Sequence, residues 1–204
     1  RADATPASPT VAAASVHDAF GGLRDELLHA LMTYRRADAD DVVQRLTGVP
    51  HETVIRQVYL PVMHEVGARW QAGSVDIAQE HFASTYVRDR LSSLLLSLGG
   101  GPRDGELVAC VTFPGERHEL GALSLAVHVA VQGFRVLYLG MDLPAHDLCT
   151  FATTRKPTWL LVSVVMPTAH EILVTYARRL RAGVPAQTSI VIGGVGLSDA
   201  LPCV

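Results

Sequence analysis

The hydrophobic periodicity of this sequence changes at one place, Gly99-Gly100-Gly101-Pro102. Before this break, apolar residues recur at spacings of three and four, which predicts amphipathic helices. After it, short apolar runs alternate with helical segments, a pattern typical of a parallel sheet with helices on both faces. Glycine and proline interrupt both kinds of element, so we expect a domain boundary here. A chain of 204 residues is long enough for two small domains.

The expected domain organisation follows from this break. Residues 1–15 are rich in Ala, Pro, Ser and Thr without a hydrophobic period, which predicts a disordered tail or linker. Residues 16–98 are predicted to form a four-helix bundle that acts as a cap, and 99–105 a linker. Residues 106–204 are predicted to form a doubly wound, flavodoxin-like or Rossmann-like domain with a parallel sheet. The fold class is therefore α + α/β.

The individual elements can be placed from the same patterns. The first helix carries an apolar stripe, and an acidic run, Asp38 to Asp41, opens the second helix. The third and fourth helices are expected at 51–70 and 75–98, and Pro61 should kink the third or remove one of its hydrogen bonds. The predicted strands are 107–112, 135–139, 159–165 and 189–192, and the helices between them are 119–131, 145–154 and 169–182.

Composition and charge exclude several classes of protein. No apolar run approaches the roughly 20 residues of a membrane-spanning helix, and a secretion signal is missing, so we expect a cytoplasmic protein without membrane contact. A net charge of -3 with only short basic clusters argues against direct nucleic-acid contact by this chain. The cysteines Cys110, Cys149 and Cys203 lack C-x-x-C spacing, so we expect reduced thiols and no zinc site.

Three short motifs fall at the carboxyl ends of predicted strands. Right-handed crossovers place these strand ends on one rim of the sheet. Each motif is common by itself, because loop histidines are usually solvated and Gly-Gly usually makes a turn. The motifs are Glu116-x-His118-x-x-Gly121, Ser163-x-Val165 and Gly193-Gly194. Together, with 41 and 27 residues between them, they resemble the cobalamin-binding signature of methionine synthase and its relatives. Glu116 and Val165 stand where that signature usually has Asp and Leu.

The resemblance implies a specific mode of cobalamin binding. His118 would be the lower axial ligand of cobalt, in the base-off, His-on form. Glu116 is close enough in sequence to accept the other imidazole N–H, which would fix the tautomer and raise the basicity of the ring. The small residues Ser163, Gly193 and Gly194 would leave a slot beside the sheet for the displaced dimethylbenzimidazole tail.

A second motif lies in the helical part, where Trp70 is followed after nine residues by Glu80-His81. Without the second domain, Trp70 would be interpreted as a core anchor and Glu80 as a solvated residue. However, Glu80 shares its helix face with the apolar Val87 and Leu91, and a carboxylate there requires a partner. The motif resembles that of the CarH/LitR photoreceptors, in which the bundle caps adenosylcobalamin. By this resemblance Trp70 packs on the adenosyl group, Glu80 hydrogen-bonds its ribose, and His81 helps to close the pocket.

The CarH/LitR resemblance implies a light-sensing regulatory module rather than an enzyme, with adenosylcobalamin as cofactor and a homo-oligomer as its assembly. Light would cleave the cobalt–carbon bond, and the resulting change in conformation or assembly would control a DNA-binding or signalling output domain outside this chain. A fused output enzyme is compatible with this. The related photocobilins also carry a bilin, so a bilin is a second candidate cofactor, although no motif identifies its site.

Two alternatives are open at this point. One is the corrinoid-carrying component of a methyltransferase, which has the same order of helical and cobalamin domains. The motif of Trp70 and Glu80-His81 favours the sensor, because it fills the upper face that a methyl carrier must expose. The other alternative is a structural relative that binds no cofactor.

The chain departs from the CarH/LitR pattern in two ways. Better-known members have a histidine directly after the motif tryptophan, which ligates cobalt after photolysis, whereas this chain has Gln71. An amide is a poor cobalt ligand, so water, His81 or His64 would take that position, with water placed first. Members also usually continue beyond the Gly-Gly motif with another helix, strand and helix, and repressors of this type carry an N-terminal winged-helix domain. We therefore expect a fragment with a truncated C-terminal end.

Overall fold

The computed structural model describes residues 19–98, 101 and 104–197. By its internal contacts the chain divides after Tyr86, inside helix α6, into two compact units, and each is described by itself. The tail expected at 1–15 lies outside the described residues, and the linker expected at 99–105 stays a prediction. Within the described residues, no helix is both long and apolar enough to cross a membrane.

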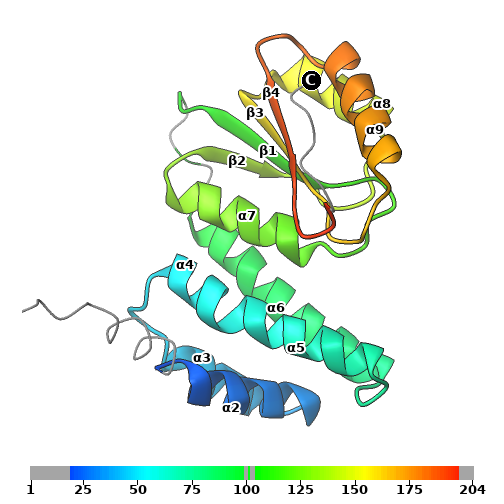
Figure 1. Ribbon diagram of the computed structural model, residues 1–204. Helices are drawn as coiled ribbons and strands as arrows, with labels where there is room; N and C mark the ends of the chain where they lie inside the picture. Colours follow the sequence, from blue (N-terminus) through cyan, green and yellow to red (C-terminus); the bar gives the residue numbers. More distant parts are fainter. Residues whose placement is uncertain (1–18, 99–100, 102–103, 198–204) are drawn as a thin grey trace, which may run out of the picture. The chain divides into compact units, whose positions relative to one another are not determined.

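The first unit consists of helices, as predicted (Figure 1). Its described elements are α2 (Gly21–Met32), α3 (Arg36–Gln44), α4 (His51–Val54), η1 (Ile55–Tyr59), α5 (Leu60–Gln71) and the first part of α6 (Ile77–Ser97). Since α4, η1 and α5 follow one another without a break, they form the single third helix that the sequence predicts. Its buried side chains include Leu27, Leu31, Val58, Val62 and Val66 from the predicted apolar stripes, and also Tyr86, which was not predicted.

The third helix accommodates Pro61 through a change of helix type. Pro61 has no N–H and its ring collides with the carbonyl four residues earlier in a regular α-helix, which here belongs to Gln57. The wider π-turn of η1 precedes the proline and contains Gln57. The Gln57 carbonyl accepts a hydrogen bond from Nη1 of Arg24 on α2, at 3.1 Å. The expected disturbance at Pro61 is therefore present, and it ties the third helix to the first.

Helix α6 begins with a capping box that the sequence analysis did not identify. The Gln79 N–H donates to Oδ1 of Asp76 at 2.8 Å, and the Asp76 N–H donates to Oε1 of Gln79 at 3.0 Å. Nε2 of Gln79 also donates to the Met32 carbonyl at the end of α2, at 2.8 Å. These bonds determine where α6 starts and place Glu80 and His81 in its first turns.

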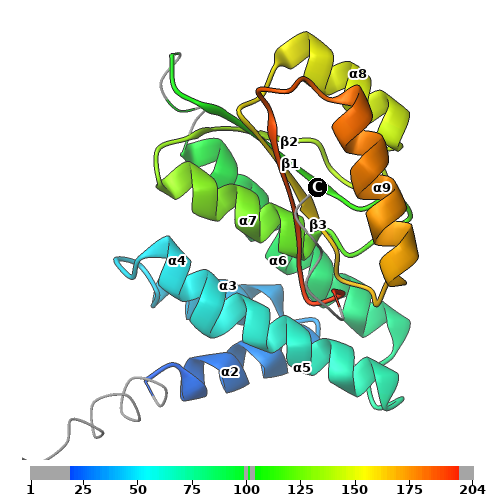
Figure 2. The same cartoon turned by 45° about the horizontal axis from the view of Figure 1, so that its top comes forward.

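The second unit contains the predicted parallel sheet. Its described strands are β1 (Leu107–Thr112), β2 (Arg135–Tyr138), β3 (Trp159–Ser163) and β4 (Ser189–Gly193), in the order β2-β1-β3-β4. Helix α7 (Leu120–Val131) covers one face, and α8 (Ala145–Arg155) and α9 (His170–Gly183) cover the other (Figure 2). The doubly wound α/β architecture is thus confirmed.

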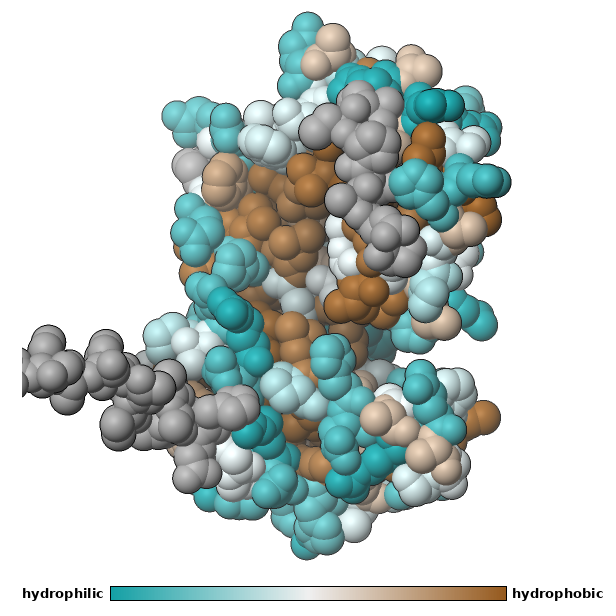
Figure 3. Space-filling model, viewed as in Figure 1, coloured by the Kyte–Doolittle hydropathy of each residue, from teal (hydrophilic) through white to brown (hydrophobic). Residues whose placement is uncertain are grey.

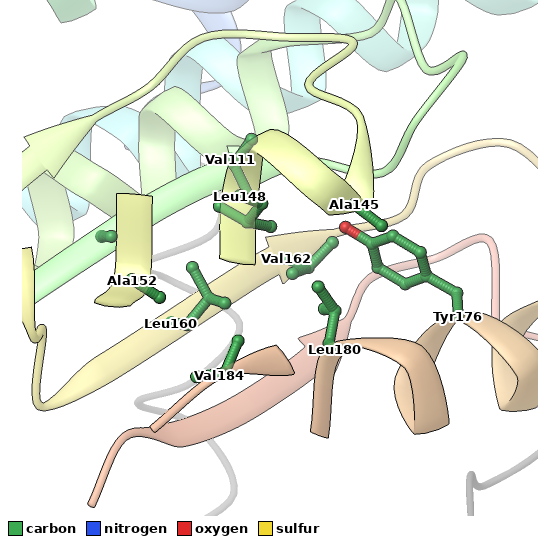
Figure 4. Close-up of a cluster of buried hydrophobic side chains, with 10 residues drawn as sticks. Val111, Ala145, Leu148, Ala152, Leu160, Val162, Tyr176, Leu180 and Val184 are labelled. Atoms are coloured by element: carbon green, nitrogen blue, oxygen red, sulfur yellow. The ribbon is translucent and has the colours of Figure 1, made fainter. Parts of the chain in front are cut away.

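The main core of this unit lies between the sheet and helices α8 and α9 (Figure 4). Alternate residues of β1 and β3 point into it, because successive side chains of a strand face opposite sides of the sheet. Its buried members are Ala109, Val111, Ala145, Leu148, Ala152, Leu160, Val162, Tyr176, Leu180 and Val184. A smaller cluster on the α7 face contains Val108, Cys110 and Ala126.

The strand order creates a topological switch point between β1 and β3. The chain continues from β1 to β2 on one side and from β3 to β4 on the other, so the loops after β1 and β3 adjoin at the carboxyl edge of the sheet. The third strand is shorter than predicted, since it ends at Ser163 and not at residue 165. The physical reason is that the N–H groups of Val165 and Met166 bond to a carboxylate and not to a neighbouring strand.

Candidate functional site

The loop after β1 begins with a tight turn that presents Glu116 and His118. The Glu116 N–H donates to the Phe113 carbonyl at 3.0 Å, with Pro114 and Gly115 in the middle of the turn. Gly115 has φ +79°, which is the left-handed conformation that a type II turn requires at its third residue. As a result, the Glu116 side chain is buried, while the side chain of His118 remains 58% exposed.

Both carboxylate oxygens of Glu116 are engaged. Oε1 accepts the backbone N–H of His118 at 2.9 Å and lies 2.5 Å from Nδ1 of the His118 ring. Oε2 accepts the N–H groups of Val165 at 3.1 Å and Met166 at 2.7 Å. Burial by itself raises the pKa of Glu116, but these hydrogen bonds from Met166, His118 and Val165 outweigh it, so the pKa lies below its ordinary value.

The ionised Glu116 determines which imidazole nitrogen is available. A carboxylate has only acceptors, so Nδ1 of His118 carries the proton in this pair. In the neutral ring Nε2 then keeps its lone pair, and the bond to Glu116 orients the ring through its other nitrogen. Histidines that ligate metals are usually held in this way by a carboxylate or carbonyl on the other nitrogen.

Gly121, Ser163 and Val165 meet at the start of α7. A Cβ atom added to Gly121 would lie 3.1 Å from Oγ of Ser163 and 3.3 Å from Cγ2 of Val165. The glycine thus allows the helix to approach the end of β3 closely. The structure brings these three predicted residues together with Glu116, which bonds to the Val165 N–H.

The two glycines of the Gly193-Gly194 motif, the last residue of β4 and the residue after it, are needed for different structural reasons. A Cβ on Gly193 would meet nothing within 4 Å, and Gly193 pairs with Ser163 in the parallel register of β3 and β4. Gly193 therefore leaves open space beside Ser163. Gly194 has φ +134°, and a Cβ there would lie 2.1 Å from the Val164 carbonyl oxygen. A glycine is thus required at 194 by the backbone and its close approach to β3, whereas the space lies at 193.

The α7 face of β3 and β4 is only partly covered. Trp159 and Val191 alternate with residues that pack against α8 and α9, so they point to the α7 side, and they remain 37% and 45% exposed. Figure 3 shows apolar side chains gathered over the sheet and α7 on the viewed face of this unit. By the same alternation, Gly193 lies on this partly covered side of the sheet, two residues after Val191.

The site also uses two residues that the sequence analysis missed, Thr112 and Asp142. Thr112 is fully buried at the end of β1, and Asp142 lies four residues after β2 with φ +54°. Both bond to the turn that carries Glu116. The signals in the sequence were a polar residue ending an apolar strand and a Gly-x-Asp segment, and neither is specific.

In the first unit, the predicted cap residues lie at the end of α5 and the beginning of α6. Trp70 is 48% exposed. Oε2 of Glu80 lies 2.6 Å from Nδ1 of His81, with the two side chains 29% and 74% exposed. The carboxylate that needed a partner therefore has the adjacent imidazole, while Val87 and Leu91 further along the helix are fully buried. Glu80 and His81 form a second carboxylate–imidazole pair.

The residues of the second unit fit a metal ion that is already coordinated by the ring of a cofactor. Among the described residues there is no group of three or more His, Cys, Asp and Glu side chains able to enclose an ion. What the unit offers is one oriented, exposed imidazole nitrogen at His118 and open space at Gly193. A cobalt ion held by a corrin needs one axial protein ligand and room for the rest of the cofactor, and these residues fit that requirement.

Comparison with known proteins agrees with this geometry. Family models for a B12 binding domain match residues 23–95 and 106–200. The chain belongs to the B12-binding domain family. The first match contains Trp70 and Glu80-His81, and the second contains the rim motifs around His118. Membership in this family supports cobalamin as the cofactor.

Two curated proteins of Myxococcus xanthus are similar to this chain of the B12-binding family. It is 33% identical over 172 residues to the HTH-type transcriptional repressor CarH of Myxococcus xanthus, covering 84% of this chain and 57% of that protein. It is 34% identical over 149 residues to the HTH-type transcriptional repressor CarA of the same organism, covering 71% and 48%. The chain thus spans about half the length of these relatives, whose names support a regulatory role.

A solved structure shows the same fold at lower identity. The monomethylamine corrinoid protein of Methanosarcina barkeri superposes with a TM-score of 0.69 and 18% identity, and the match covers 88% of this chain and 87% of that one. Identity at this level supports the fold of the B12-binding chain and not its activity.

Proposed function

We propose that this chain is a light-sensing regulatory module that binds adenosylcobalamin. The observation that carries the proposal is the Glu116–His118 pair, in which an ionised, fourfold hydrogen-bonded carboxylate leaves Nε2 of the imidazole free for cobalt. The likeness to two transcriptional repressors supports regulation as the output.

Each site residue has a proposed task. His118 serves as lower axial ligand, and Glu116 fixes its tautomer and orientation. Ser163 and Gly193 leave room for the nucleotide tail, while Gly121, Val165 and Gly194 set the close approach of α7 and of the chain after β4 to the end of β3. In the helical unit, Trp70 packs on the adenosyl group, Glu80 hydrogen-bonds its ribose and His81 helps to close the pocket. When bound, the cofactor supplies a cobalt–carbon bond that light can cleave.

The output is proposed to lie outside the cobalamin-binding residues. The relatives are HTH-type repressors about twice as long as the matched region, which supports a DNA-binding or signalling segment as the partner of this module. We expect the module itself to form homo-oligomers in the cytoplasm without touching DNA. A bilin would be a second chromophore, and it would appear as separate absorption in the visible spectrum.

The test is the visible spectrum of the protein loaded with adenosylcobalamin, in the dark and after green or blue light. We expect a base-off, His-on spectrum in the dark and a lasting change after illumination. His118→Ala should weaken binding and give a base-on spectrum, whereas His146→Ala, which removes an exposed histidine of α8 in the same unit, should change neither. An unchanged His118→Ala spectrum would show that the ligand assignment is wrong.

The choice of upper ligand separates the sensor from the corrinoid component of a methyltransferase. The sensor should bind adenosylcobalamin more tightly than methylcobalamin, because Trp70 and Glu80 are proposed to contact the adenosyl group. Preference for the methyl form, with methyl transfer to a thiol acceptor, would support the methyltransferase component. Failure to bind any cobalamin would contradict both.

A further inference from the structure

The turn that carries Glu116 is held from the side of β2 by one residue, Asp142. Oδ1 of Asp142 accepts the N–H of Gly115 at 2.7 Å. The backbone N–H of Asp142 donates to Oγ1 of Thr112 at 3.1 Å, and this hydroxyl donates to the Glu116 carbonyl at 3.2 Å. Through these three bonds, Asp142 and Thr112 together hold Gly115 and Glu116 in place.

Of these three bonds, the one between Thr112 and Glu116 is the costliest to lose, since the Asp142–Thr112 bond is only part-buried and the Gly115–Asp142 bond is exposed. Thr112 is fully buried, and the bond from its hydroxyl to the Glu116 carbonyl is buried as well. A buried donor or acceptor that loses its partner has no water to replace it. The end of β1 is also tied to the segment after β2, because the Thr112 N–H donates to the Gly140 carbonyl at 3.2 Å.

The two hydrogen bonds of Asp142 explain its unusual backbone conformation. Its φ of +54° is left-handed, which is unfavourable for most side chains and is tolerated best by Gly, Asn and Asp. In this conformation the same residue can offer its N–H to Thr112 and its carboxylate to Gly115. A strained residue that is held at a candidate site often contributes to the geometry of that site.

We propose that Asp142 and Thr112 are positioning residues for the lower axial ligand. They set the height and direction of the Glu116 turn, and Glu116 in turn orients the His118 ring. Neither residue touches cobalt. The inference rests on the proposed function, in that His118 is the residue that binds cobalamin.

The left-handed backbone of residue 142 allows a clean set of variants. Asp142→Gly keeps the conformation and removes the acceptor, whereas Asp142→Asn keeps both the conformation and an acceptor oxygen. Thr112→Val removes the hydroxyl at nearly constant volume, and Thr112→Ser restores it. Lys156→Gly is the matched control, because Lys156 is also left-handed, with φ +48°, at the C-terminal end of α8.

The experiment is a titration of each purified variant with hydroxocobalamin, followed by the visible spectrum and the dissociation constant. For Asp142→Gly and Thr112→Val we expect about tenfold weaker binding and a partial return of the base-on spectrum, as for other partners that orient a metal-binding histidine. Asp142→Asn, Thr112→Ser and Lys156→Gly should resemble the wild type. Wild-type affinity and spectrum in both Asp142→Gly and Thr112→Val would overturn the proposal, as would an equal change in Lys156→Gly.

A measurement without cofactor separates this inference from the proposed function. In the apoprotein, Asp142→Gly should speed hydrogen exchange of the Gly115 amide and alter the ring nitrogen chemical shifts of His118, while Asp142→Asn restores both. Unchanged His118 shifts in Asp142→Gly would overturn the positioning role. If the wild type fails to bind cobalamin through His118, the proposed function is wrong, but the apoprotein result still decides whether Asp142 positions the ring. If Asp142→Gly does not fold, the Thr112→Val and Thr112→Ser pair decides.

Discussion

The backbone N–H of Met166 donates a 2.7 Å hydrogen bond to Oε2 of Glu116, and this bond ties the loop after β1 to the end of β3. The two strands are neighbours in the sheet, and the chain leaves them in opposite directions. Glu116 therefore has two tasks. It orients His118 through one oxygen and stabilises the end of β3 through the other.

The first prediction concerns the pH dependence of stability. Glu116 has a lowered pKa in the folded protein, so its ionised form stabilises the fold above its ordinary pKa of 4.5. This stabilisation is lost as the pH falls below 4.5 and through the lowered folded pKa. At pH 7, Glu116→Gln should lower the free energy of unfolding of the apoprotein by about 1–3 kcal/mol, since an amide cannot accept all four hydrogen bonds.

The measurement is urea unfolding of wild type and Glu116→Gln from pH 7 to pH 3. The difference between them should shrink below pH 4.5. Glu171→Gln, at an exposed position of α9, is the control and should stay within about 0.5 kcal/mol of the wild type. A difference between Glu116→Gln and wild type that is constant across this range would show that the charge of Glu116 does not stabilise the fold.

The second prediction separates the two glycines at the end of β4, Gly193 and Gly194. Gly194→Ala should destabilise the apoprotein by about 3 kcal/mol or more, because φ is positive and the new Cβ would collide with the Val164 carbonyl. Gly193→Leu should leave the fold intact, since its Cβ meets nothing within 4 Å, but should abolish cobalamin binding by filling the slot. Thermal unfolding and cobalamin titration test the pair. Normal binding by Gly193→Leu would place the nucleotide tail elsewhere.

The third prediction concerns the π-turn of the third helix. Arg24→Met should destabilise the protein by about 1–2 kcal/mol, because the Gln57 carbonyl loses the guanidinium that replaces the missing N–H of Pro61. Pro61→Ala in the same background should recover part of this loss by supplying an N–H in its place. A double-mutant cycle in urea measures the coupling. Arg56→Met, which removes only an exposed ion pair with Glu52, should cost less than about 0.5 kcal/mol; an equal cost for the two arginines would contradict a specific role of Arg24.

The fourth prediction tests the proposed cap. Trp70 is 48% exposed, so Trp70→Ala should cost little stability. It should reduce the affinity for adenosylcobalamin more than that for hydroxocobalamin, because only the adenosyl group is proposed to contact this ring. Trp159→Ala, which changes an exposed tryptophan of the second unit, is expected to affect both forms alike. Equal loss of both forms in Trp70→Ala would count against the cap.

The sequence by itself determined the elements of this protein and the residues of its site motifs. Hydrophobic periods of 3.6 and 2 are local properties, so the helices and strands were predictable within a few residues. Strands joined by crossover helices run parallel, so their carboxyl ends lie at one edge of the sheet, and His118, Ser163 and Gly193 could be assigned to this rim from the sequence. The disturbance at Pro61 was also expected, because it follows from the covalent structure of proline.

Tertiary structure alone decided how these residues are connected. The carboxylate of Glu116 bonds to Val165 and Met166, the guanidinium of Arg24 to Gln57, and Asp142 to Gly115. Each bond joins segments that are distant along the chain, and its existence depends on strand order and on the approach of helices. The pattern of apolar and polar residues along the sequence does not show which single residues the strand order and the helix packing will bring together. Gly193 and Gly194 differ for the same reason. The sequence motif does not distinguish them, and only the packed backbone shows that Gly193 leaves open space whereas Gly194 is required by its close approach to the Val164 carbonyl.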